Sequence, residues 1–267
     1  MLNNKIENKG KNNKNINNDS LEIYKLGEHY LLHADSTDAS VVDDFLQKVL
    51  GEQKISLILT DPPYGVNYVK SKESLGLKVA KTKTIENDGY QSDEKYTDLT
   101  IGWCDPLKKY LSEYNTYYIF NGDSKLFALY KALKELNFYN SQLLIWIKNS
   151  CILGRKDYLP QHELIAYGWY GKHKFKKSKD KSVLFYPKPN KSKLHPTMKP
   201  VGLLRRLILN STNINDFVID SFGGSGSTLI ACEQTKRKCL MIEKDKEYIL
   251  TIISRYEKIT GIKAIKL

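Results

Sequence analysis

The fold is decided by residues 217–228, which read FVIDSFGGSGST. An apolar, β-forming run ends in Asp220, a turn of small residues follows, and a helical pattern begins at residue 228. A strand, a glycine-rich turn and a helix N-terminus in this order let a ligand approach backbone amides closely. The stretch therefore predicts a ligand-binding turn in an α/β sheet, with a purely structural tight turn as the alternative.

This turn differs from the common phosphate-binding loops. No lysine follows Gly226, as a Walker loop requires, and Leu229 occupies the third glycine position of the dinucleotide motif. The next apolar run, residues 239–242, ends in Glu243, where doubly wound folds place a carboxylate that accepts hydrogen bonds from ribose hydroxyls. An adenosine-containing ligand without a pyrophosphate fits this pattern better.

A second segment combines a carboxylate, a rigid kink and an aromatic ring. Residues 55–59 form an apolar run that leads through Thr60 into Asp61-Pro62-Pro63-Tyr64. Prolines lack an N–H group, so the local carbonyls can accept hydrogen bonds from a ligand, and Asp61 adds a second acceptor. Two acceptors and a stacking ring suit an amino group on a flat heterocycle such as an extruded nucleobase. The alternative is a proline-rich turn in which Tyr64 only packs.

The rest of the chain alternates short strands with helices. Further strands are predicted at residues 117–120 and 143–147, and helices at residues 125–136, 201–209, 228–235 and 246–259. This alternation predicts an α/β fold: a Rossmann-like, doubly wound, mostly parallel sheet with helices on both faces. Residues 1–20 are an Asn/Lys-rich arm that we expect to be disordered, and residues 21–267 form one domain with long loops at 65–90 and 171–194.

Charge points to a polyanionic partner. The 267 residues contain 42 Lys+Arg against 30 Asp+Glu, a net charge of +12, and nucleic acid is the first candidate. Much of the surplus lies between residues 172 and 193, where nine lysines face only Asp180. A solvated loop is the plain alternative. The four cysteines lack zinc-ligand spacing, so no metal is predicted, and without a signal peptide or membrane span we expect a cytoplasmic protein.

With residues 195–200, His-Pro-Thr-Met-Lys-Pro, these motifs resemble the DNA amino-methyltransferases that use S-adenosylmethionine. The Asp-Pro-Pro-Tyr motif precedes the glycine-rich turn, which is similar to the permuted β group of that family. The resemblance covers nearly all of residues 21–260, including segments 83–88, 144–149 and 162–165. It implies the class I methyltransferase fold and S-adenosyl-L-methionine as cofactor.

The resemblance also implies residue roles. The catalytic residues would be Asp61, Pro62, Pro63 and Tyr64. Asp35 would contact the cofactor adenine, although a helix cap is an alternative role, and Glu243 would hold the ribose. The remaining cofactor contacts would be Asp61, Thr197, Lys199, Asp220, Ser221, Phe222, Gly224, Ser225, Gly226 and Thr228. Ser221 stands where many β-group members have proline, which predicts a less rigid turn.

The expected activity is methylation of the adenine N6 amino group in a flipped-out base of double-stranded DNA. Lysines expected to contact DNA are Lys70, Lys81, Lys83, Lys172, Lys174, Lys176, Lys177, Lys179 and Lys181. The alternatives are cytosine N4 methylation, which Asp61 disfavours, and a non-catalytic DNA-binding protein on the same fold. An RNA or protein methyltransferase also stays open. The resemblance further suggests a cognate restriction endonuclease, a homodimer, nucleoid association and no membrane partner.

Overall fold

The computed structural model describes residues 21–63, 92–151, 157–176, 179–188 and 198–267. The arm at residues 1–20 and the loop at 65–90 lie outside the described residues. So do six predicted site residues: Tyr64, Lys70, Lys81, Lys83, Lys177 and Thr197. Among the described helices, none combines the length and the apolar character needed to cross a lipid bilayer.

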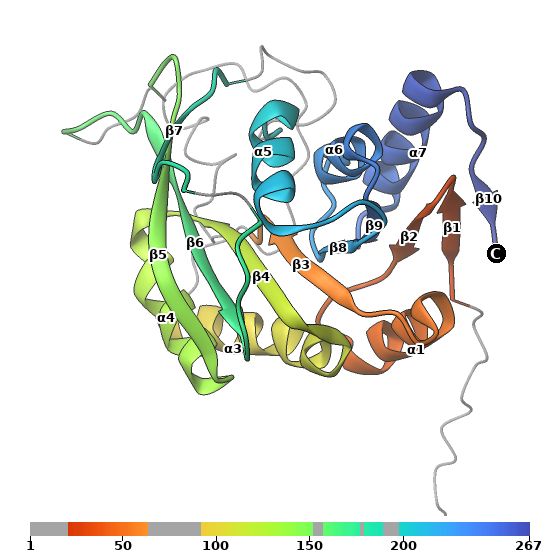
Figure 1. The fold of residues 1–267 in the computed structure, drawn as a ribbon, viewed down its shortest axis with the longest axis horizontal. Helices are drawn as coiled ribbons and strands as arrows, with labels where there is room; N and C mark the ends of the chain where they lie inside the picture. The colour runs from red at the N-terminus through yellow and green to blue at the C-terminus, as the bar shows by residue number, and fades with distance from the viewer. Residues whose placement is uncertain (1–20, 64–91, 152–156, 177–178, 189–197) are drawn as a thin grey trace, which may run out of the picture.

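A single ten-stranded sheet forms the centre of the described structure, in the order β10-β1-β2-β9-β8-β3-β4-β6-β5-β7 (Figure 1). The five strands from β2 to β4 in this order are mutually parallel, whereas β6 runs antiparallel to both β4 and β5. The strands are β1 (Ile23–Leu26), β2 (His29–His33), β3 (Ile55–Thr60), β4 (Leu111–Asn121), β5 (Phe138–Ile147), β6 (His162–Tyr170), β7 (Val183–Phe185), β8 (Phe217–Asp220), β9 (Lys238–Glu243) and β10 (Ile265–Lys266).

Helices cover both faces of the sheet (Figure 1). They are α1 (Ala39–Leu50), α3 (Asp93–Cys104), α4 (Leu126–Glu135), α5 (Val201–Ser211), α6 (Ser227–Thr235) and α7 (Lys246–Thr260), with short 3-10 turns η1 (Asp105–Tyr110) and η2 (Asp123–Lys125). Side chains alternate between the two faces along a strand, so each strand feeds two cores. In β4, Tyr117 belongs to the core that includes residues of α1, α3 and α4, whereas Tyr118 belongs to the core that includes residues of α5, α6 and α7.

Topology brings the predicted motifs to one edge. Parallel strands end at the same edge of a sheet. The next strand after β3 in the chain, β4, lies on one side of β3 in the sheet, whereas β8 and β9 lie on the other side of β3. In doubly wound sheets such a switch point forms the ligand crevice. Asp61 follows β3, and Asp220 and Glu243 end β8 and β9. The three acidic residues therefore occupy adjacent strand ends.

The predicted doubly wound α/β fold is confirmed, and the predicted strands and helices all form, within a few residues at most ends. One prediction was wrong: residues 171–194 are not simply a loop, because β7 forms within them. The outer edge of β5 exposes unpaired backbone groups, and β7 pairs with it in parallel, matching Ile145 with Val183. Helices α1 and α3 and strands β1, β2, β6 and β10 were not predicted from sequence.

Candidate active site

Neighbouring strand ends place two aspartates side by side. Asp61 follows β3 and Asp220 ends β8, and these strands pair in parallel. The Thr60 hydroxyl donates to Asp220 Oδ1 at 2.8 Å, which ties the two ends together. Pro62 is buried and Pro63 half-buried directly after Asp61. The carboxylate and the rigid proline pair are thus fixed at the centre of the sheet's carboxyl edge.

Backbone geometry explains the glycine-rich turn. Gly224 and Gly226 have φ of 51° and 76°, a conformation that favours glycine. A Cβ on Gly223 would stand 2.8 Å from Met241 Cγ, so this position has no room for a larger residue. The Gly224 amide donates to Glu243 Oε2 at 2.7 Å. The turn and the end of β9 therefore form one unit.

The polar groups of this turn are only partly satisfied within the described chain. Ser221 Oγ is buried and has no hydrogen-bond partner among the described residues. Phe222 is half-buried and packs edge-on against Trp103, with ring centroids 5.7 Å apart. Arg255 of α7 donates to the Ser225 carbonyl at 2.8 Å and to Ser227 Oγ at 3.1 Å. Thr228, in the first turn of α6, is buried.

Two carboxyl groups at this edge, those of Asp220 and Glu243, have a raised pKa. Burial raises the pKa of Asp220 to about 7, although hydrogen bonds from Thr228, Thr60 and the Phe222 amide favour its charged form. Burial also raises the pKa of Glu243, and the amides of Asp245 and Gly224 only partly offset it. Buried carboxylates whose pKa rises in this way are typical of functional sites.

Asp35 stands near the Glu243 end of this edge. It follows β2, and the adjacent Ala34 amide donates to the Glu243 carbonyl at 3.0 Å. Asp35 Oδ1 accepts from the Thr37 amide at 2.9 Å and its hydroxyl at 2.7 Å, while Oδ2 lies 3.4 Å from Lys244 Nζ. The helix-cap alternative for Asp35 was wrong, because Asp38 caps α1 by accepting from the Val41 amide.

Lys199, predicted as a cofactor contact, forms an ion pair with Asp61 Oδ2. Its Nζ also lies 3.1 Å from Glu163 Oε2, and Glu163 Oε1 lies 2.7 Å from Lys148 Nζ. Sequence reasoning gave Glu163 and Lys148 no role. The available signal was a charged residue at one end of an apolar run, after residues 143–147 and before residues 164–166.

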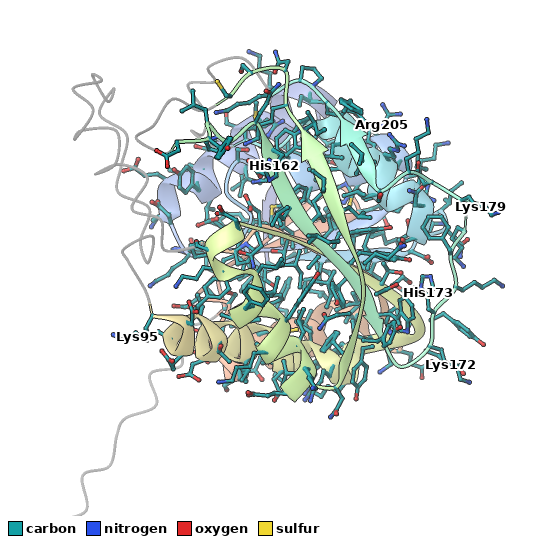
Figure 2. The ribbon with its side chains drawn as sticks, turned by 90° about the vertical axis from the view of Figure 1, so that its left-hand side faces the viewer. Lys95, His162, Lys172, His173, Lys179 and Arg205 are labelled. Carbon is teal, nitrogen blue, oxygen red and sulfur yellow. The ribbon has the colours of Figure 1, made fainter. Side chains whose placement is uncertain are left out.

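The described lysines between residues 172 and 188 lie at different levels of the sheet, from one edge to the other. Lys172 forms a bridge with Tyr114 near the start of β4 and an ion pair with Glu113, so it lies at the edge opposite Asp61. In Figure 2, Lys172 and His173 lie low in the view and His162, the first residue of β6, lies high. Lys179 lies at a height between those of His173 and His162. Lys188 reaches the carboxyl edge, where its amide donates to Asn149 Oδ1 at 2.9 Å. The other described lysines predicted to contact DNA, Lys174, Lys176 and Lys181, are exposed.

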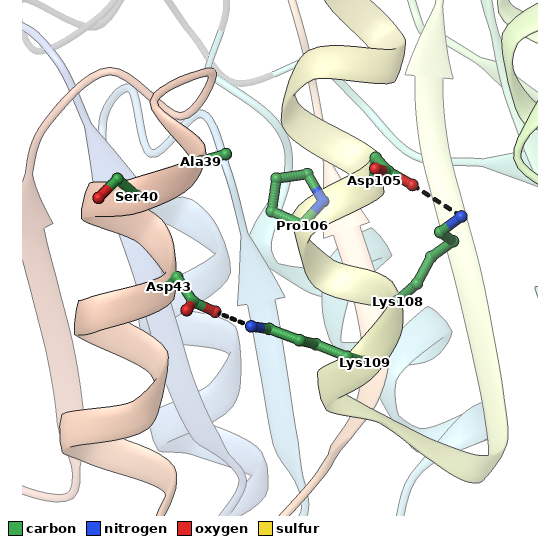
Figure 3. A pocket seen from close by; sticks show the side chains of 7 residues that line it. All are labelled: Ala39, Ser40, Asp43, Asp105, Pro106, Lys108 and Lys109. Atoms are coloured by element: carbon green, nitrogen blue, oxygen red, sulfur yellow. Dashed lines mark ion pairs between the residues drawn. The ribbon is translucent and has the colours of Figure 1, made fainter.

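An open hollow of about 580 Å³ lies between α1 and η1 (Figure 3). Its lining consists of Ala39, Ser40, Asp43, Asp105, Pro106, Lys108 and Lys109. The charged side chains of this hollow form ion pairs with one another, between Asp43 and Lys109 and between Asp105 and Lys108. It shares no residue with the acidic edge and offers no separate argument for a ligand.

The acidic edge suits an adenosine-containing ligand. Glu243 accepts from the Gly224 amide on Oε2 and from the Asp245 amide on Oε1, which orients a carboxylate that can also accept from hydroxyls. The unpaired Ser221 hydroxyl adds a polar contact in the turn. Asp61, with its charge balanced by Lys199, lies beside this edge and is one-quarter exposed.

Comparison with known proteins agrees with this geometry. The family model described as DNA methylase matches residues 55–254. The Type II methyltransferase M.HpaI of Haemophilus parainfluenzae is 29% identical over 230 residues, which are 76% of this chain and 68% of that protein. The crystal structure of the M1.HpyAVI-SAM complex superposes with a TM-score of 0.61 at 27% identity, covering 84% of this chain and 98% of the other.

A more distant structure shares the fold. The cytosine-N4-specific PvuII DNA methyltransferase superposes with a TM-score of 0.64 at 19% identity. The superposition covers 86% of this chain and 89% of that one.

Proposed function

The chain belongs to the DNA methylase family of N6-adenine and N4-cytosine enzymes, and from this premise we propose that it methylates the N6 amino group of adenine in double-stranded DNA. S-adenosylmethionine supplies the electrophilic methyl group. The observation that carries the proposal is the position of Asp61-Pro62-Pro63 at the carboxyl end of β3, beside the edge formed by Asp220 and Glu243. The aspartate at position 61 favours adenine over cytosine.

The donor would lie along the ends of β8, β9 and β2. Glu243 would accept hydrogen bonds from the ribose hydroxyls, and Asp35 would face the adenine end, because the ends of β2 and β9 are adjacent. Ser221, Phe222, Gly224 and Gly226 would line the turn beside them. Asp220, held by Thr60, would lie between this turn and Asp61.

Asp61 and the Pro62 carbonyl would activate the target nitrogen. The lone pair of an exocyclic amino group is delocalised into the ring, which makes the nitrogen a poor nucleophile. Two acceptors placed on its two N–H bonds favour a pyramidal nitrogen whose lone pair points at the methyl group. Lys199 holds one oxygen of Asp61, so the carboxylate has a fixed orientation. Tyr64 would stack on the flipped base.

The transfer needs no strong base. The methylated nitrogen carries a positive charge and is acidic, so it loses a proton readily to Asp61 or to water. No cysteine follows a proline in this chain, which argues against the covalent route used on cytosine C5. Positioning and electrostatics therefore supply the rate enhancement.

Lysines near the carboxyl edge would hold the DNA phosphates. Lys188 lies at this edge, with Lys179 and Lys181 below it on the same segment, and Lys70, Lys81 and Lys83 follow the catalytic tetrapeptide in sequence. A cognate restriction endonuclease and a homodimer are further partners proposed from the family resemblance.

Nucleoside mass spectrometry of DNA treated with the purified protein and S-adenosylmethionine tests the target. We expect N6-methyl-2′-deoxyadenosine and no N4-methyl-2′-deoxycytidine. The opposite product would replace adenine by cytosine within the same family. Absence of both products from a folded, cofactor-binding protein would contradict the proposed function and favour a non-catalytic DNA-binding protein.

Asp61→Ala tests the role of the carboxylate. We expect it to lower the rate of methyl transfer by at least about 100-fold, because one of the two acceptors on the target nitrogen is lost. Circular dichroism and cofactor titration check that the variant still folds and binds. Near-wild-type transfer by the folded variant would refute the assignment.

A further inference from the structure

Four charged side chains of alternating sign form a chain that ends at Asp61. Lys148 Nζ lies 2.7 Å from Glu163 Oε1, Glu163 Oε2 lies 3.1 Å from Lys199 Nζ, and Lys199 pairs with Asp61. They come from four separate places: the end of β5, the start of β6, the residue before the cap of α5 and the end of β3. The Lys148 side chain is 1% exposed and that of Asp61 is 25% exposed. The chain thus runs from the core to the reacting edge.

Such a chain is costly to bury. Desolvation of ionised side chains opposes folding, and buried ion pairs are often no more stable than apolar residues of the same volume. The two lysines also stand over aromatic rings, Lys148 at 5.2 Å from the Trp146 centroid and Lys199 at 5.0 Å from that of Phe120. Core packing alone therefore does not explain why four charges occupy this place.

Each charged side chain of this chain affects the charge or the position of its neighbour. An isolated Lys199 would draw the negative charge of Asp61 toward itself and weaken that carboxylate as an acceptor. Glu163 shares the Lys199 ammonium, since Nζ lies against both carboxylates. Lys148 in turn anchors Glu163 from the side away from Lys199. The neighbouring Asp61 and Glu163 raise the pKa of Lys199 despite its burial, so the ammonium stays charged.

We propose that Glu163 and Lys148 are positioning residues for methyl transfer, acting on Asp61 through Lys199. The inference rests on the proposed function, because Asp61 must be the group that contacts the amino nitrogen. Glu163 fixes where the ammonium stands and how much of its charge falls on Asp61. Lys148 balances part of the charge of Glu163, so that Lys199 stays paired with Asp61. Neither residue contacts the reacting atoms.

Glu163→Gln is the direct test, because it keeps the shape of the side chain and removes its charge. We expect kcat to fall about 10-fold or more, while KM for DNA and Kd for S-adenosylmethionine stay within about twofold, since the loss is confined to the transition state. Glu163→Asp keeps the charge and should retain most of kcat. A Glu163→Gln enzyme with wild-type kcat would overturn the inference.

The matched control is Glu233→Gln. Glu233 also forms two polar contacts, with His29 Nε2 and Tyr256 Oη, each at 2.9 Å, but it lies near the end of α6, away from Asp61. We expect this variant to lose thermal stability and keep kcat. An equal loss of kcat in both variants would make the Glu163 effect merely structural and overturn the inference.

A double-mutant cycle tests the route. If Lys148 acts only through Glu163, Lys148→Met combined with Glu163→Gln should be no slower than Glu163→Gln alone. Losses of kcat that multiply would show that Lys148 acts separately from Glu163, against the inference.

If Glu163→Gln fails to fold, Lys148→Met alone serves as the test, and we expect it to lower kcat and leave KM unchanged. Inactivity of the wild type would instead refute the proposed function, whereas an active wild type with unaffected variants refutes only this inference.

Discussion

Asp220 illustrates how a buried carboxyl group of the candidate site opposes stability. The side chain is buried at the end of β8, and burial raises its pKa to about 7 from an ordinary value near 3.8. Below pH ~4 the carboxyl is protonated in both the folded and the unfolded chain. Between pH ~4 and ~7 the unfolded chain loses this proton while the fold retains it, so the free energy of unfolding falls as pH rises through this window.

Asp220→Asn should therefore stabilise the protein most at high pH. We expect the free energy of unfolding of the variant, relative to wild type, to increase by about 2–3 kcal/mol from pH 5 to pH 8, because one pKa unit corresponds to about 1.4 kcal/mol. The same variant should bind S-adenosylmethionine more weakly. Thermal unfolding at several pH values measures the difference.

Comparison with Asp98→Asn separates this effect from general charge. Asp98 is an exposed carboxylate on α3, so its replacement should give a nearly pH-independent difference. If the Asp220→Asn difference from wild type were also constant between pH 5 and pH 8, the raised pKa of Asp220 would be wrong.

Residues 179–188 are attached to the fold by the Asp180 side chain, by β7 and by two hydrogen bonds after β7, from Trp146 Nε1 to the Tyr186 carbonyl and from the Lys188 amide to Asn149 Oδ1. Asp180 Oδ2 accepts from Arg206 Nε at 2.9 Å and from Asn210 Nδ2 at 2.7 Å, both on α5. These bonds hold the pKa of Asp180 well below its usual range, with Arg206 as the main cause. The aspartate therefore anchors the segment and does little to offset the lysines around it.

Asp180→Asn should loosen this segment. Loss of a partly exposed, bidentate ion pair costs about 1 kcal/mol, which should raise local opening and tryptic cleavage after Lys179 or Lys181 by about threefold to tenfold. Limited proteolysis followed by mass spectrometry measures the rates. Asp105→Asn, which removes an ion pair to Lys108 inside η1, is the control and should leave them unchanged. Equal cleavage of Asp180→Asn and wild type would show that β7 and the hydrogen bonds after it hold the segment without Asp180.

Elements with regular apolar patterns were predictable, and contacts between distant elements were not. Residues 55–59 and 217–219 were recognised as strands because they are short, apolar and bounded by polar residues. The three-residue β7 carries no pattern of its own and forms because β5 leaves an open edge. Motifs placed Asp61 and Asp220 at strand ends.

The pairing of Lys199 with Asp61 could not be predicted, because it depends on how segments 138 residues apart meet. Glu163 and Lys148 were missed for the same reason. A charged residue beside a strand is usually exposed, and only the register of β5 and β6, which pairs Trp146 with Glu163, turns these two inward. The sequence thus predicted Asp61 as the reacting group, which stays a prediction, while the charged side chains around it became evident only from the fold.

The described lysines between residues 172 and 188 are distributed along the direction of the strands, from one edge of the sheet to the other. Lys172 bridges to Tyr114, seven residues before Asn121 at the carboxyl end of β4. Thr116 of β4 pairs with Leu57 of β3, which is four residues before Asp61, and Tyr114 lies beyond this point. At about 3.3 Å per residue, Lys172 therefore lies more than roughly 13 Å below the edge that holds Asp61. Lys181 lies before β7, which runs parallel to β5 toward the carboxyl edge. Lys188 follows β7 and lies at that edge. If the target base enters beside Asp61, as proposed, we expect the DNA to lie above this edge and to contact Lys181 and Lys188 rather than Lys172.

Two double variants test this division by the salt dependence of DNA binding. Lys181→Gln with Lys188→Gln should reduce the slope of log K against log[salt] by up to about 2, because each lost phosphate contact releases about 0.9 fewer counterions. Lys172→Gln with Lys174→Gln should leave the slope unchanged, since Lys172 lies at the opposite edge and pairs with Glu113. Fluorescence anisotropy with a labelled duplex between 50 and 200 mM salt gives both slopes. Equal reductions in the two variants would mean that DNA wraps down the β5 side of the sheet.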